Sequence, residues 1–69
     1  MGSTGEFVLS VIRAHPGGIS TMEIVAYGRS KSNVYRAASR LEKYGLVTHE
    51  TVLTKGKSKI IVWRPVYDS

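Results

Sequence analysis

The stretch from Ser30 to Val47, SKSNVYRAASRLEKYGLV, gathers side chains that can donate hydrogen bonds. Serine, asparagine, tyrosine, arginine and lysine recur in it, with one acidic residue, Glu42, among them. Arginine and lysine side chains carry donors and no acceptor, so they bind phosphates, carboxylates and carbonyl oxygens. The chemistry that this stretch can do is therefore the recognition of hydrogen-bond acceptors, anionic ones above all.

Bond-making chemistry has much less support in the sequence. The chain has no cysteine and two histidines, His15 and His49, far apart along it. No nucleophile, base and orienting group can be combined into a set, and the carboxylates are dispersed. Gly17-Gly18 is a loop pair rather than a phosphate-binding motif. We therefore expect no enzyme activity, no cofactor and no metal site, because so few histidines without cysteines or clustered carboxylates cannot form one.

Positive charge is concentrated in the same part of the chain. The net charge is +5, and the pI is about 9.9. The segment from Arg29 to Lys59 holds eight lysine and arginine residues against two glutamates, a net charge of +6, so the remaining residues carry about −1. This concentration indicates a surface for a polyanionic partner, although a solvated face would have a similar composition.

The length of the chain limits its architecture. Its 69 residues predict a single domain over 1–69, and so short a chain buries only about 60% of the surface that its unfolded form exposes. No apolar run approaches the roughly 20 residues that span a bilayer, and no signal-peptide pattern begins the chain, so we expect no membrane partner and a cytoplasmic or nucleoid-associated protein. The absence of glutamine and the single asparagine raise the hypothesis of a thermophilic, archaeal or viral source.

Two short helices are predicted before the basic stretch. Ser3 and Glu6 have the spacing of a capping box, and Phe7, Val8, Val11 and Ile12 recur at helical spacing until His-Pro-Gly-Gly, which predicts a helix over about 4–14. Ser20 and Glu23 form a second capping box, with Ile19 and Ile24 at the positions of a hydrophobic staple. A second helix over about 20–27 follows, ended by Gly28 in a left-handed conformation.

A third helix is predicted over 31–44, capped by Ser30 and ended by Gly45. At 100° per residue its core side consists of Val34, Ala37, Ala38, Leu41 and Tyr44. The opposite arc consists of Ser32, Asn33, Arg36, Ser39, Arg40 and Lys43, with Tyr35 at its edge.

The remaining chain has the pattern of a β-hairpin. Residues 46–53 and 60–64 are rich in β-branched residues, and Pro65 ends the second run. The loop over 54–59 contains Lys55, Lys57 and Lys59, which alternate and would project to one side if the loop were extended. We expect Trp63 to anchor the hairpin to the helices. The predicted class is α+β, three helices followed by a two-stranded antiparallel hairpin.

Two segments carry a resemblance to a known family. STMEIVAYGRSKSNVYRAASRLEKYGLV is similar to the helix-turn-helix of bacterial and archaeal winged-helix regulators, in its Ser-capped helix and closing Leu-x-x-x-Gly-Leu-Val. VTHETVLTKGKSKIIVWRP resembles the wing of such proteins. The resemblance covers about residues 4–65 and identifies no subfamily. It implies a winged helix-turn-helix domain that binds double-stranded DNA, as a transcriptional regulator or a small architectural protein.

The resemblance also implies a role for each polar residue. The third helix would lie in the major groove, with its N-terminal turns foremost, so Asn33 and Arg36 would contact base edges. Phosphate or mixed contacts would come from Lys31, Ser32, Tyr35, Arg40 and Lys43. Lys55, Lys57 and Lys59 would follow the backbone or rest at the minor groove. A homodimer could use only the first helix or the hairpin edge.

Two alternatives stay open at this point. Structured or single-stranded RNA attracts the same cations, whereas the asparagine–tyrosine pair of Z-form-duplex binders falls on Tyr35 and Ser39 here, so that signature fails. A protein-interaction winged helix would need an exposed apolar patch, against which the basic third helix argues. Tyr35 could instead be a packing residue on the hairpin.

Overall fold

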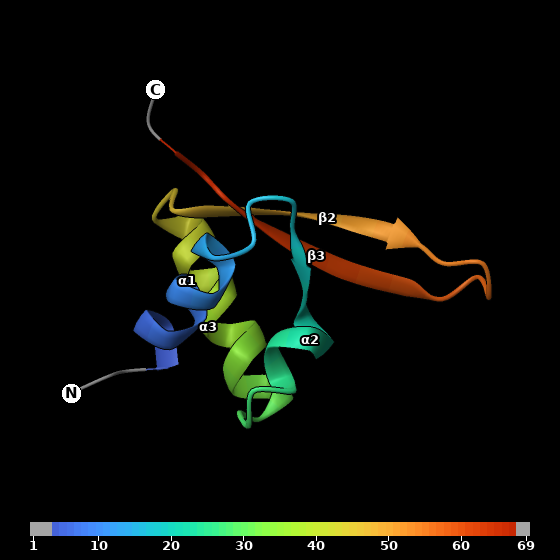
Figure 1. Ribbon diagram of the computed structural model, residues 1–69, viewed down its shortest axis with the longest axis horizontal. Coiled ribbons are helices and arrows are strands. Elements are labelled where there is room, and N and C mark those ends of the chain that lie inside the picture. Colours follow the sequence, from blue (N-terminus) through green and yellow to red (C-terminus); the bar gives the residue numbers. More distant parts are fainter. Residues whose placement is uncertain (1–3, 68–69) are drawn as a thin grey trace.

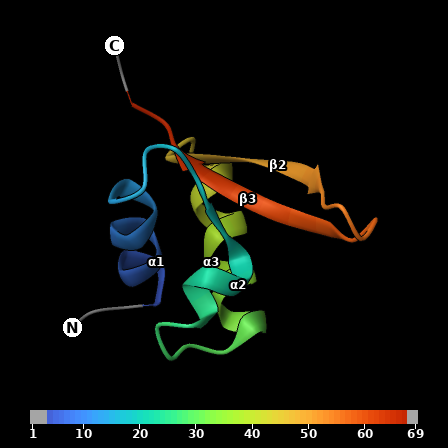
Figure 2. The same ribbon diagram turned by 45° about the vertical axis from the view of Figure 1, so that its right-hand side comes forward.

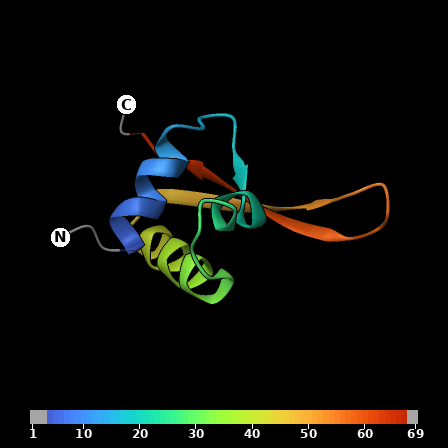
Figure 3. The same cartoon turned by 60° about the horizontal axis from the view of Figure 1, so that its bottom comes forward.

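The computed structural model describes residues 4–67 of the chain. Three helices gather at one end of the molecule, and a hairpin projects beyond them (Figures 1 and 3). The elements in chain order are α1 (Thr4–Arg13), β1 (Ile19–Ser20), α2 (Thr21–Val25), α3 (Lys31–Lys43), β2 (Val47–Leu53) and β3 (Lys59–Pro65). The fold is a small α+β domain, and none of the described helices is long and apolar enough to cross a membrane.

The start of α2 follows directly from its local sequence. The Glu23 backbone N–H donates to Ser20 Oγ at 3.2 Å, and the Ser20 N–H donates to the Glu23 carboxylate at 3.0 Å, which confirms the predicted capping box. The Ser20 backbone N–H lowers the pKa of the exposed Glu23 carboxyl below its usual 4.5, and the Ser20 side chain lowers it further. The capping-box prediction for Ser3 and Glu6 falls outside the described residues.

The end of α2 comes earlier than predicted. The helix stops at Val25 instead of residue 27, because the N–H groups of Tyr27 and Gly28 donate three residues back, to Ile24 and Val25, and tighten the chain into a turn. Gly28 has a φ of +104°, so its predicted left-handed conformation is confirmed.

Helix α3 has the predicted caps at both ends. Ser30 Oγ accepts from the Asn33 N–H at 3.3 Å. At the other end Gly45 has a φ of +79°, and the Leu46 N–H donates to the Leu41 carbonyl at 3.0 Å. That bond is the long bond of a Schellman motif, which reverses the chain and sends it into β2.

The core lies between the helices and one face of the sheet. Its buried side chains are Val8, Val11, Ile12, Ile19, Ile24, Val34, Ala38, Leu41, Val47 and Trp63. The Trp63 indole N–H donates to Thr21 Oγ1 at 2.8 Å, so the predicted anchoring role of this residue is confirmed. The prediction for Tyr44 is wrong, since its side chain is 70% exposed. Tyr44 is the C-cap of α3, where the chain turns away, and Leu46 packs against the core from that end instead.

The sheet has three strands, so the prediction of a sheet made only of a two-stranded hairpin is wrong. In the order β1-β3-β2, Ile19 pairs with Trp63 and Ser20 with Val62, all antiparallel. Gly18, just before β1, has a φ of +110°, and a Cβ on it would lie 2.7 Å from Val62 Cγ1. Only glycine allows the chain to approach β3 so closely.

The second strand of the hairpin is longer than predicted, 59–65 instead of 60–64, and includes Pro65, whereas the first strand begins one residue later than predicted, at Val47. β2 and β3 pair from Val47 with Pro65 to Leu53 with Lys59. The Thr54 N–H donates to the Ser58 carbonyl at 2.8 Å, the Lys57 N–H donates to the Thr54 carbonyl at 2.9 Å, and Lys57 has a φ of +63°. The expectation that three lysines project to one side of an extended loop is therefore wrong, because two of them lie in this turn and only Lys59 lies in a strand.

Candidate functional site

Helix α3 presents its polar residues on two opposite flanks. Residues Asn33, Arg36 and Arg40 line a groove of about 560 Å³ toward α1, which we call the α1–α3 groove. Lys31 and Tyr35 line a narrower space of about 140 Å³ toward β3, which we call the α3–β3 crevice. Figure 2 shows α3 between α1 and the strands. The predicted site residues are therefore brought together in two sets rather than one.

The α3–β3 crevice joins the start of α3 to the start of β3. Lys31 is the first residue of α3, and Lys59 is the first residue of β3. Tyr35 lies between them with its side chain 49% exposed, and its ring meets Trp63 edge to face at a centroid distance of 6.2 Å. The ring of Tyr35 therefore packs on the hairpin, the alternative left open for this residue, while about half of the residue stays exposed. The crevice is also lined by the apolar side chains of Met22, Ile60 and Ile61, so its two ammonium groups are what could attract a phosphate.

The α1–α3 groove combines an apolar floor with polar rims. The floor consists of Leu9, Ala37, Leu41 and Leu46, and Thr4, Gly5 and Glu6 form the side toward α1. Asn33, Arg36 and Arg40 are exposed on the opposite side. Two guanidinium groups against one carboxylate give the groove a net charge of +1. Planar guanidinium and amide groups can bond base edges or carboxylates in pairs of hydrogen bonds.

The other predicted residues lie apart from both sets. Ser32 and Lys43 are exposed on the outer surface of α3, about 16 Å apart along the helix axis at 1.5 Å per residue. Lys55 and Lys57 lie at the tip of the hairpin, beyond the helices. Arg29, counted within the basic segment, lies with its Cζ atom 4.6 Å from the Phe7 ring centroid, which gives it a packing role.

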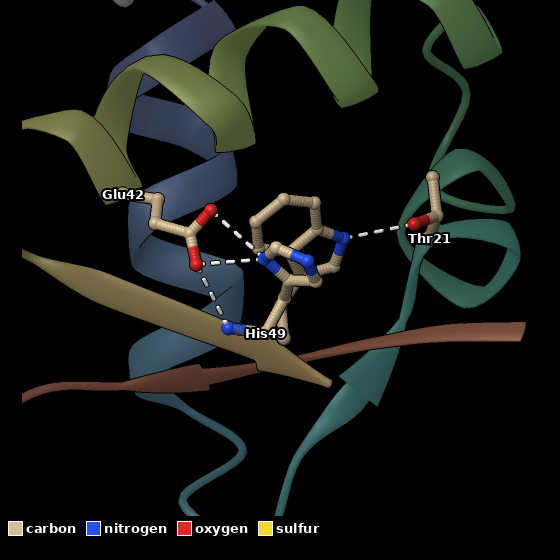
Figure 4. A network of polar contacts seen from close by, with 4 residues as sticks. Thr21, Glu42 and His49 are labelled. Atoms are coloured by element: carbon tan, nitrogen blue, oxygen red, sulfur yellow. Dashed lines mark hydrogen bonds and ion pairs between the residues drawn. The ribbon is translucent and has the colours of Figure 1, made fainter. Parts of the chain in front are cut away.

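An interaction that the sequence did not predict joins α3 to β2. The Glu42 carboxylate accepts from the His49 backbone N–H at 3.2 Å and contacts His49 Nδ1 at 2.7 Å (Figure 4). The His49 ring lies 5.0 Å from the Trp63 ring, centroid to centroid. Glu42 and His49 are seven positions apart in the sequence, across a chain reversal, so sequence spacing alone contains no signal for this contact.

Both carboxylates of the basic segment are thus engaged away from its cations. Glu42 contacts His49, and Glu50 on β2 accepts a hydrogen bond from Arg64 on β3. Among the described residues, the lysines and arginines of α3 and of the hairpin turn form no ion pair with either of these two carboxylates. Within residues 4–67, no three His, Asp or Glu side chains gather into a group that could hold a metal ion.

The comparisons with known proteins add no family to this geometry. No protein-family model matches the chain, and no curated protein matches it. Its function must therefore be argued from the two flanks of α3 and from the hairpin.

Proposed function

We propose that the protein binds double-stranded DNA as a winged helix-turn-helix domain and regulates transcription by occupying its site. Helix α3 would lie in the major groove, and the hairpin turn would rest on the backbone or minor groove. The described order of helices and strands is compatible with this fold, with β1 as a short third strand.

The observation that carries the proposal is the α3–β3 crevice. A lysine from α3 and a lysine from β3 line the same space, with the phenol of Tyr35 between them. A phosphate backbone that followed this crevice would meet the helix and the hairpin together. Glu42 and Glu50 contact His49 and Arg64, so neither carboxylate forms an ion pair with the lysines of the crevice.

The proposed roles divide between the two flanks of α3. Asn33 and Arg36 would contact base edges, where each good pair of bonds discriminates between bases by about 1–3 kcal/mol. The residues proposed to hold phosphates are Lys31, Ser32, Tyr35, Arg40, Lys43, Lys55, Lys57 and Lys59. Several of these stand one after another along α3, so the protein could be positioned by the backbone before bases are contacted.

The experiment is a fluorescence anisotropy titration of a labelled mixed-sequence duplex over a series of salt concentrations. If about six phosphates are neutralised, log affinity should fall with log salt at a slope of roughly −5. Lys31→Gln should reduce the slope by about 1. Arg13→Gln is the matched control, because Arg13 is an exposed cation at the end of α1 and lines neither flank of α3.

Two outcomes would contradict the proposal. A slope near zero would remove its electrostatic basis. Tighter binding to single-stranded or A-form RNA than to the duplex, at equal salt, would assign the same cations to RNA.

A further inference from the structure

The α1–α3 groove has the dimensions of a small-molecule site. Its volume of about 560 Å³ lies within the range of roughly 300–1,000 Å³ that ligand pockets occupy. The floor of this groove is the edge of the core, where Leu9, Leu41 and Leu46 converge from α1, α3 and the chain after α3. An apolar floor beneath a polar rim is the usual design of a site that buries the body of a ligand and orients its head.

The rim selects the charge of the ligand. Arg36 and Arg40 stand one helical turn apart on α3, and both line the groove. Guanidinium groups match the geometry of a carboxylate, to which each can donate two parallel hydrogen bonds. Glu6 on the α1 side would repel a second negative charge, which favours a ligand with a single carboxylate at the α3 side.

We propose that the α1–α3 groove binds a small molecule with an apolar body and one carboxylate. The body would cover the leucine floor, and the carboxylate would accept hydrogen bonds from Arg36 and Arg40. A ligand held in this way would occupy Arg36, the residue proposed to contact base edges. Ligand and duplex would then exclude one another. This mutual exclusion rests on the proposed DNA binding, whereas the proposed ligand site is independent of it.

The test is an amide NMR titration of the ¹⁵N-labelled full chain, without DNA, with 4-butylbenzoate as the probe. Shifts should concentrate at Leu9, Ala37, Arg40 and Leu46. The neutral 4-butylbenzamide should bind roughly three- to tenfold more weakly, because it lacks the charge-assisted bonds. Plain benzoate should also bind more weakly, because it leaves most of the floor uncovered.

Variants can distinguish binding by the two rim arginines from a general attraction between the probe and the positive charge of the protein. The pair Arg36→Gln and Arg40→Gln should weaken 4-butylbenzoate by roughly three- to tenfold and leave 4-butylbenzamide unchanged. Lys43→Gln is the matched control, because it removes a cation from the same helix outside the groove. Both arginines are exposed, so the fold should survive, and the probe comparison on the unchanged chain needs no variant.

Several results would overturn the proposal. Equal binding of the charged and neutral probes, or shifts outside the groove, would remove the carboxylate site. A concentration-dependent dimer, detected by sedimentation and weakened by the arginine variants, would make a second copy of the chain the occupant. If the probe binds the groove while a bound duplex is not displaced, mutual exclusion is wrong; if no duplex binds at all, the probe shifts still decide the site.

Discussion

The α3–β3 crevice and the α1–α3 groove lie on opposite flanks of one helix and differ in the chemistry that they offer. The crevice is small and carries two ammonium groups and the phenol of Tyr35, whose ring packs on the buried Trp63. The groove is four times larger in volume, about 560 against 140 Å³, and carries guanidinium and amide groups over leucines. Ammonium groups attract any phosphate, whereas guanidinium and amide groups discriminate by geometry.

The two flanks of α3 would therefore contribute differently to DNA binding, one to affinity and the other to sequence selectivity. Under the proposed function, the crevice would supply sequence-independent attachment, and the groove side would supply the choice of site. Changes on the two flanks should therefore have different signatures, one in overall affinity and salt dependence and the other in discrimination.

The largest expected effect is on stability, through Trp63, on whose ring Tyr35 of the crevice packs. Trp63→Ala should lower the free energy of unfolding by about 3–5 kcal/mol, because it empties the core beneath Tyr35 and removes the bond to Thr21. Thermal unfolding followed by circular dichroism measures this. Tyr44→Ala is the aromatic control and should change stability by less than about 0.5 kcal/mol, since Tyr44 is exposed. Equal losses in both variants would show that Trp63 does not hold this flank.

Charge reversal in the crevice should have the next largest effect. The double variant Lys31→Glu, Lys59→Glu should weaken duplex binding roughly a hundredfold at low salt and reduce the salt slope by about 2, whatever the DNA sequence. Anisotropy titrations on two unrelated duplexes measure both quantities. A loss confined to one of the two sequences would contradict the division between flanks.

On the groove side the expected effect is smaller and of another kind. Arg36→Ala should reduce discrimination between the preferred duplex and single-base variants by about 1–3 kcal/mol at one position, with little change in the salt slope, because a base contact neutralises no phosphate. Selection of preferred sites from a random duplex pool, followed by titration of single variants, measures it. If Arg36→Ala weakens every sequence equally, Arg36 contacts phosphate and the groove side does not select.

The smallest expected effect concerns α2, whose Thr21 and Met22 line the crevice and which carries no cation. The Ser20 bonds lower the pKa of Glu23 in the folded state, so its ionised form contributes stability above the unfolded pKa, near 4.5. This contribution is lost as the pH falls from that value through the lowered folded pKa. Glu23→Gln should therefore flatten the stability profile below about pH 4.5, measured by urea unfolding at several pH values. An unchanged acid profile would contradict the capping role.

Much of the helical framework could be predicted from the sequence because its signals are local. Ser20, Ser30 and Gly45 each act within a few residues of their own position, and the structure has the caps that they predict. β1 could not be predicted, because two residues carry no periodicity and their pairing with β3 depends on contacts more than 40 residues away. The exposure of Tyr44 could not be predicted from helical periodicity, because it depends on where the chain turns after α3.

The candidate site was predictable by residue type and not by arrangement. Helical spacing predicted that Arg36 and Arg40 would lie away from the core face of α3, and both are exposed. Which flank faces α1 and which faces β3 follows from tertiary packing, and so does the contact between Glu42 and His49. The turn that contains Lys55 and Lys57 depends on a positive φ at a lysine, for which a run of alternating lysines offers no warning.

The measurement that tests the central claim most directly is an amide NMR titration of the ¹⁵N-labelled protein with a short mixed-sequence duplex at low and at high salt. The proposed function predicts shifts concentrated in residues 30–43 and 54–59, on both flanks of α3, that fade as salt rises. Shifts elsewhere, or none in these segments at low salt, would contradict it and leave RNA or a protein as the partner.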